Sequence, residues 1–136
     1  MINFKFNLTT RYKEWHNYKS YDYLEYEGEF TVTINSKTFF QEPYFTVLEF
    51  LRDALDWVGC ENKTKPMLYN SIETEENPLI SFIERSGKWY VQSPWQKYEC
   101  DITFTRGELE KAVLDLKHTI IKEHPEFQTS STLKEE

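Results

Sequence analysis

The carboxylates best placed to act together are Glu25, Glu27 and Glu29, which occupy every second position of one stretch. In a β-strand this spacing puts all three on one face, about 7 Å apart. Glu99 and Asp101 show the same spacing in a second stretch. If the two strands are neighbours, their outer face is a negative patch that attracts cationic partners. Catalytic carboxylate pairs need a cleft and a raised pKa, so the pattern predicts a binding surface or, more simply, a solvated face that maintains solubility.

The histidines and cysteines form no motif for acid–base, nucleophilic or metal chemistry. His118 and His124 belong to a predicted helix, and His16 lies in a polar, tyrosine-rich connection. Cys60 and Cys100 have neither C-x-x-C nor metal-ligand spacing, as expected of reduced thiols in a cytosolic protein. The sequence therefore predicts a protein without catalytic residues, metal or cofactor, although a site assembled from distant residues is not visible in one sequence.

The charge of the chain narrows its classes of partner. The 136 residues include 16 lysines and arginines against 23 aspartates and glutamates, for a formal net charge of −7. Phosphate backbones and anionic lipids repel such a protein, so we expect neither nucleic-acid nor membrane binding. The first residues lack the pattern of a signal peptide, and no apolar run is as long as a membrane span. These features predict a cytoplasmic protein whose partners, if any, are basic.

Alternating apolar residues predict the strands that position these groups. The clearest alternation covers residues 24–34, where most even positions are apolar and the odd positions are acidic or carry hydroxyl groups. A tight turn at Asn35-Ser36-Lys37 then leads into a short partner strand, Thr38 to Gln41. The other predicted strands are residues 2–8, 79–84, 89–93 and 98–104, with a hairpin turn at Arg85-Ser86-Gly87-Lys88.

The first predicted helix, residues 43–58, is unusually apolar. Pro43 suits its first turn, and Gly59 suits its end. Nine of the fourteen residues from Phe45 to Val58 are apolar, which is more than the one stripe of a surface helix. This helix is therefore either covered on two sides or exposed as an interface, which would make the protein a structural or homodimeric subunit.

The second helix completes the predicted fold. Thr105 and Glu108 have the spacing of a capping box, and an apolar stripe continues to about Glu123. The order of three strands, helix, three strands, helix predicts an α+β fold with one antiparallel sheet of about six strands and both helices on its apolar face. Residues 1–124 form one domain in this prediction, and residues 125–136 form a polar C-terminal tail.

The connection of residues 60–78 supplies an alternative site. A loop of this length is uncommon in a compact domain unless it is functional or disordered. A small enzyme or ligand-binding protein would have its site between the sheet and this loop. A pocket that holds His16 or Cys60 beside a carboxylate would favour that alternative.

Two tryptophans near the second hairpin are candidate contacts. Aromatic platforms for single-stranded nucleic acid need a basic groove beside them, which this acidic chain does not predict. Tryptophan is, however, a favoured anchor of protein interfaces. We therefore add Trp89 and Trp95 to the predicted contacts with a basic protein.

The second half of the chain contains the motifs Glu76-Asn77-Pro78-Leu79-Ile80-Ser81-Phe82-Ile83, Lys88-Trp89, Ser93-Pro94-Trp95-Gln96 and Tyr98-Glu99-Cys100. These motifs resemble a small family of uncharacterised proteins from low-GC Gram-positive bacteria. The resemblance covers most of residues 2–123 and implies no activity. In size, charge and fold class the chain is also similar to bacterial immunity proteins, which neutralise toxins made by the same cell.

These observations favour a noncatalytic protein-binding module, of the immunity type, that inhibits a basic toxin by covering its active site. The predicted contact residues are Glu25, Glu27, Glu29, Glu99, Asp101, Trp89 and Trp95.

Overall fold

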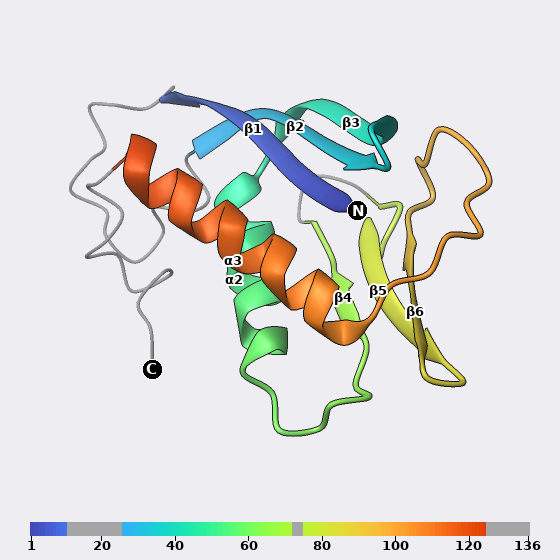
Figure 1. Ribbon diagram of the computed structural model, residues 1–136. Coiled ribbons are helices and arrows are strands. Elements are labelled where there is room, and N and C mark those ends of the chain that lie inside the picture. Colours follow the sequence, from blue (N-terminus) through green and yellow to red (C-terminus); the bar gives the residue numbers. More distant parts are fainter. Residues whose placement is uncertain (11–25, 72–74, 125–136) are drawn as a thin grey trace.

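Two three-stranded antiparallel sheets and two helices make up the computed structural model, which describes residues 1–10, 26–71 and 75–124 (Figure 1). Sheet A has the strand order β1-β2-β3, and sheet B has the order β4-β5-β6. The elements are β1 (Ile2–Thr10), β2 (Tyr26–Ile34), β3 (Lys37–Phe45), α2 (Val47–Val58), β4 (Met67–Tyr69), β5 (Ile80–Arg85), β6 (Lys88–Gln92) and α3 (Arg106–Glu123).

Sheet A follows the predicted alternation. Phe30, Val32 and Ile34 of β2 are buried, whereas Glu29, directly before Phe30, is exposed. The turn into β3 is the predicted one, because Asn35 and Ser36 both have positive φ angles, as a two-residue hairpin turn requires. Period-two patterning and a short polar turn therefore determine the β2–β3 hairpin.

The first helix begins later than predicted. Pro43 belongs to β3, and α2 starts only at Val47. The strand continues past the proline because Phe45 still pairs with Gly28 of β2. A proline is tolerated there because β3 is an edge strand, whose outward-facing positions need no N–H donor.

The apolar excess of α2 is used inside the protein. Val47, Leu48, Phe50, Leu51, Ala54 and Trp57 are all buried. The helix contacts α3, β2 of sheet A and β4 of sheet B, so it is covered on more than one side. Most of the surface that suggested a homodimer through residues 43–58 is thus buried within one chain.

Sheet B differs from the prediction in one of its three strands. The β5–β6 hairpin is as predicted, with Ser86 and Gly87 at positive φ in its turn. Its third strand is β4, which lies inside the predicted loop of residues 60–78 and pairs with β5. Residues 98–104 form no strand; they make one isolated bridge, between Phe104 and Trp89.

Helix α3 has the predicted start and the predicted buried stripe. The Glu108 N–H donates to Thr105 Oγ1 at 3.1 Å, and the Thr105 N–H donates to Glu108 Oε1 at 2.8 Å. This reciprocal pair is the capping box. Leu109, Ala112, Val113, Leu116 and Ile120 are buried along one side of the helix. Neither this helix nor α2 is long and apolar enough to cross a membrane.

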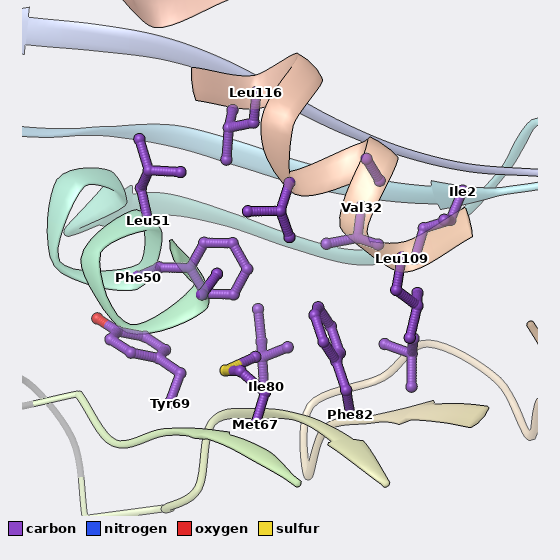
Figure 2. Packing of buried hydrophobic residues seen from close by; sticks show 14 of the residues in the cluster. Ile2, Val32, Phe50, Leu51, Met67, Tyr69, Ile80, Phe82, Leu109 and Leu116 are labelled. Carbon is purple, nitrogen blue, oxygen red and sulfur yellow. The ribbon is translucent and has the colours of Figure 1, made fainter. Parts of the chain in front are cut away.

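Both sheets and both helices contribute to one core. Figure 2 shows side chains from sheet A, α2, α3 and sheet B converging on the same interior. The Phe4 ring of sheet A stacks on Phe82 of sheet B, with centroids 6.3 Å apart. The Phe50 ring of α2 meets Tyr69 of β4 edge-on at 5.6 Å.

The α+β class and the order of three strands, helix, three strands, helix are confirmed. The single sheet of about six strands is not: the strands form two separate sheets. The segment 93–104 lies where the two would join. Its Lys97 N–H donates to the Phe39 carbonyl of β3 at 2.8 Å, and Phe104 exchanges two backbone hydrogen bonds with Trp89 of β6. Irregular chain therefore occupies part of the β3 edge and the β6 edge.

Candidate functional site

The outer face of sheet B, which points away from the core, carries a wide concave surface. We call it the sheet-B hollow; its volume is about 810 Å³. It is bounded by the residues before β5, by the outer face of β5 and β6, and by the segment that follows β6. The lining residues are Asn77, Pro78, Ser81, Gln92, Ser93, Pro94, Gln96, Tyr98, Glu99 and Cys100.

Strand register brings the floor of the hollow together. Ser81 of β5 pairs with Gln92 of β6, so both side chains lie on the same face. The neighbours of Ser81 in β5, Ile80 and Phe82, are buried in the core on the opposite face. Ser81 is nevertheless only 6% exposed, so its hydroxyl forms the bottom of a depression.

Side-chain hydrogen bonds shape the segment that forms one wall. Gln96 Oε1 accepts from the Ser93 N–H at 3.0 Å, and Gln96 Nε2 donates to the Tyr98 carbonyl at 2.9 Å. Ser93 Oγ accepts from the Trp95 N–H at 3.0 Å. These bonds satisfy backbone groups that no strand pairing satisfies, and they hold the wall in one conformation.

The opposite wall is held by Asn77. Its side-chain carbonyl accepts from the Ser71 N–H at 2.9 Å, and its amide donates to the Ser71 carbonyl at 3.1 Å. Asn77 thus pairs with Ser71 as a neighbouring strand would, just beyond the end of β4. The peptide bond from Asn77 to Pro78 is cis.

Tyr98 connects the hollow to sheet A. Its ring meets Phe39 edge-on at 5.9 Å, and Lys37 Nζ lies 4.0 Å from the ring centroid. Burial and then the neighbouring Cys100 thiol raise the pKa of Tyr98 above its ordinary value. A tyrosine hydroxyl is a hydrogen-bond donor near neutral pH even at its ordinary pKa of about 10, and the raised pKa extends this to higher pH.

The hollow is suited to binding. Among the described residues that line it, Glu99 is the one charged residue, and the others are mostly amides, hydroxyls and prolines. No histidine lines it, and the described residues contain no group of three or more His, Cys, Asp or Glu side chains able to hold a metal. A carboxylate surrounded by neutral polar groups is suited to a cationic side chain.

The predicted acidic residues fall into separate places. Glu25 lies outside the described residues, and Glu27 belongs to β2. Glu29 is exposed on the outer face of sheet A, where it pairs with Asn7 of β1. Glu99 and Asp101 lie in the irregular segment after β6, so strand pairing does not join them to the β2 glutamates in one patch.

The two predicted tryptophans also separate. Trp89 is 3% exposed and packs edge-on against Trp57 at 5.3 Å. Its ring belongs to the core and is not available as a surface contact. Trp95 is 37% exposed beside the hollow, as an anchor for a partner requires.

A second concave surface, of about 390 Å³, lies between α2 and residues 60–68, whereas the alternative site was expected between the sheet and the loop of residues 60–78. Cys60 shares it with Asp53, Asp56 and Lys65. Burial raises the pKa of Asp53, and the adjacent Arg52 partly offsets that effect. We call this surface the Cys60 hollow.

Sequence reasoning missed most of the residues that line the sheet-B hollow. Asn77, Ser81, Gln92 and Gln96 are neutral, and no chemical motif marks them. The available signal was that Asn77, Ser81 and Gln96 belong to the motifs at residues 76–83, 93–96 and 98–100, which converge on the hollow although they are apart in sequence.

The fold and the hollow define a small α+β protein with two separate antiparallel sheets and a polar depression on the outer face of one of them. The chain belongs to the family described as a domain of unknown function (DUF7878), whose model matches residues 2–124. Neither the curated proteins nor the solved structures compared with the chain include a match. The expectation of an uncharacterised family is thereby confirmed.

Proposed function

We propose that this protein is a noncatalytic protein-binding module that takes a basic segment of a partner into the sheet-B hollow. The observation that carries the proposal is the position of Glu99, the one charged group among the described residues that line the hollow. The net charge of −7 adds long-range attraction for a cationic partner.

The surroundings of Glu99 supply the rest of a recognition surface. Ser81, Gln92 and Gln96 offer hydrogen-bonding groups to a peptide backbone or to a guanidinium. Trp95 presents a partly exposed ring beside them, and Asp101 is exposed two residues beyond Glu99. In this proposal an arginine or lysine of the partner enters the hollow, while Trp95 packs on its aliphatic part.

The finer proposal is an immunity-type inhibitor that covers the active site of a basic toxin in the cytoplasm of a Gram-positive bacterium. Support comes from the small acidic α+β architecture and from the binding-type hollow. The proposal keeps Glu25, Glu27 and Glu29 as a second surface that steers a basic partner.

Affinity capture with the full chain tests the proposal. We expect a stoichiometric basic protein to be retained from the native cell and identified by mass spectrometry. Glu99→Gln and Trp95→Ala should each weaken its retention, and retention by the unmodified chain should fall as salt is raised. Asp115→Asn is the matched control, since it removes one exposed carboxylate from α3, outside both proposed contact surfaces. Equal losses for Asp115→Asn and Glu99→Gln would remove the hollow from the proposal.

The Cys60 hollow supports a second candidate, a ligand-binding protein. The specific observation is that Cys60 shares a concave surface with Asp53 and Asp56, as the alternative requires. A screen of small cationic compounds by NMR tests it, with Leu68 and Cys60 as reporters. Chemical-shift changes that survive Asp53→Asn and Asp56→Asn together would speak against a role for the carboxylates.

A further inference from the structure

The outer face of sheet B is ordered in three rows across the strands. Leu68, Ser81 and Gln92 are partners in the first row, Ile83 and Tyr90 in the second, and Arg85 and Lys88 in the third. Successive rows are about 7 Å apart, because every second residue of a strand points to the same face. The face therefore has a polar end, an apolar middle and a basic end.

The basic end is a rigid hairpin turn. Arg85 and Lys88 are exposed and flank Ser86 and Gly87, whose positive φ angles define the turn. The Gly87 N–H donates to Glu84 Oε2 at 2.7 Å, which fixes the turn further. The Arg85 guanidinium lies 5.4 Å from the centroid of the Tyr90 ring, so its charge is on the outer face and points along it.

The opposite end of the same face is acidic. The sheet-B hollow begins at Ser81 and Gln92, and Glu99 is its charged lining residue. The middle row lies between the two ends and contributes the half-buried side chains of Ile83 and Tyr90. Leu68, in the first row, adds a further apolar side chain to the face, and this side chain is 47% exposed. The face thus has basic side chains beyond one side of its apolar centre and the hollow with Glu99 beyond the other.

We propose that a second copy of this chain docks on the outer face of sheet B, through a twofold axis that lies in the interface and crosses the strands at the Ile83–Tyr90 row. Such an axis reverses the strand direction, so the Arg85–Lys88 turn of each copy faces the Glu99 hollow of the other. An axis parallel to the strands would instead oppose Arg85 to Arg85. The charges therefore select one arrangement, and an isologous interface repeats each attraction twice.

This inference rests on the proposed function, because it assigns the same hollow a basic occupant, here the hairpin turn of a second copy. Self-association then regulates the site: the dimer buries Glu99, and a basic partner must displace the second copy. Partner binding and dimerisation compete for one carboxylate, and each weakens the other in proportion to its own affinity.

Sedimentation of the full chain, with and without charge reversal, tests the dimer. The unmodified chain should dimerise, with an affinity that falls as salt is raised. Arg85→Glu and Glu99→Lys should each weaken dimerisation at least about tenfold, because each change converts both symmetric attractions into repulsions. Both residues are exposed, so the variants keep the fold, and circular dichroism checks this. Lys111→Glu on α3 is the control and should dimerise like the unmodified chain.

Mixing the two variants gives the sharper result. In a mixed dimer both contacts are again between opposite charges, so equal amounts of Arg85→Glu and Glu99→Lys chains should associate with each other while neither associates with itself. An unmodified chain that stays monomeric at millimolar concentration overturns the inference. So does a mixture that behaves as two separate monomers.

The experiments distinguish a failure of the dimer from a failure of the proposed function. Arg85→Glu should leave partner capture intact or improve it, because the hollow is freed, whereas Glu99→Gln should weaken capture. If the dimer forms as described and no basic partner is ever retained, the proposed function fails and the self-association stands. If capture depends on Glu99 and no dimer forms, only the self-association fails.

Discussion

Arg106 packs over Trp57: its guanidinium carbon is 4.0 Å from the centroid of the indole ring, and its Nη2 donates to the Trp57 carbonyl oxygen at 2.7 Å. The same guanidinium donates to the Lys63 carbonyl at 2.9 Å and forms an ion pair with Glu110. One side chain at the start of α3 thus secures the end of α2 and the chain that follows it. Planar, bidentate contacts of this kind are specific to arginine.

Arg106→Ala should lower the free energy of unfolding by about 2–4 kcal/mol, because it removes two hydrogen bonds to backbone carbonyls and the contact with the indole. Arg106→Lys should lose roughly half of that, since an ammonium cannot make the fork of bonds. Urea unfolding monitored by tryptophan fluorescence measures both. Lys111→Ala, which breaks an exposed pair with Asp115, is the control and should change stability by less than about 0.5 kcal/mol.

A buried carboxylate supplies the next prediction. Glu49 is 2% exposed, and its Oε1 accepts a hydrogen bond from the Tyr69 hydroxyl at 2.8 Å. Thr46 Oγ1 lies 3.1 Å from the same oxygen. Tyr69→Phe removes one donor from a buried charge and should cost about 1–3 kcal/mol of unfolding free energy. Tyr44→Phe, at a side chain that is 72% exposed, should cost nothing measurable.

The same tyrosine makes the free energy of unfolding depend on pH in the alkaline range. Burial, and then the Glu49 carboxylate, raise the pKa of Tyr69 far above its usual value of about 10. The raised pKa means that the folded state keeps the proton, so this stabilising contribution is fully present below about pH 10 and is lost as the pH rises further. The difference in stability between the unmodified chain and Tyr69→Phe should therefore shrink between pH 9 and pH 11 (roughly the range in which a free tyrosine ionises). A constant difference over that range would contradict the raised pKa.

Asp53 should show its effect at acidic pH. Burial raises its pKa, and the Arg52 charge only partly offsets the shift. Because the folded state then binds the proton more tightly than the unfolded state, the contribution of Asp53 is present below about pH 4 and is lost as the pH rises through the raised value. Asp53→Asn should therefore gain stability relative to the unmodified chain between about pH 3 and pH 6. Urea unfolding across this range measures the change, with Asp115→Asn on the exposed side of α3 as the control.

The fold was predictable wherever one local rule decided the outcome. Thr105 and Glu108 satisfy each other's backbone N–H groups, so two residue types three positions apart were enough to locate the start of α3. Pro43 shows the opposite case. Proline favours the first turn of a helix, but Pro43 lies in β3 because Phe45 pairs with Gly28. Only the folded sheet brings these two segments together.

The candidate site was harder to predict because it depends on that long-range arrangement. Trp89 and Trp95 have the same residue type and lie six positions apart, yet one is in the core and the other is at the surface. The alternation of β6 explains Trp89, whereas Trp95 follows an irregular turn to which no period applies. Glu99 likewise lines the hollow because residues 98–104 form an irregular segment and not the predicted strand.

Gln96 provides a test of how this irregular wall supports binding. Its two hydrogen bonds, from the Ser93 N–H and to the Tyr98 carbonyl, join the two ends of the wall. Gln96→Ala removes both and should speed hydrogen exchange at the Ser93 amide, while global stability falls by only about 1–2 kcal/mol because the wall lies outside the core.

Gln96→Glu separates the two bonds. A carboxylate still accepts from the Ser93 N–H, but it cannot donate to the Tyr98 carbonyl and repels it instead. We expect protection of the Ser93 amide to be retained, whereas hydrogen exchange at the Tyr98 end of the wall should become faster. If Gln96→Ala leaves partner capture unchanged while Ser93 exchanges faster, the wall need not be rigid, and recognition must depend on the floor formed by Ser81 and Gln92.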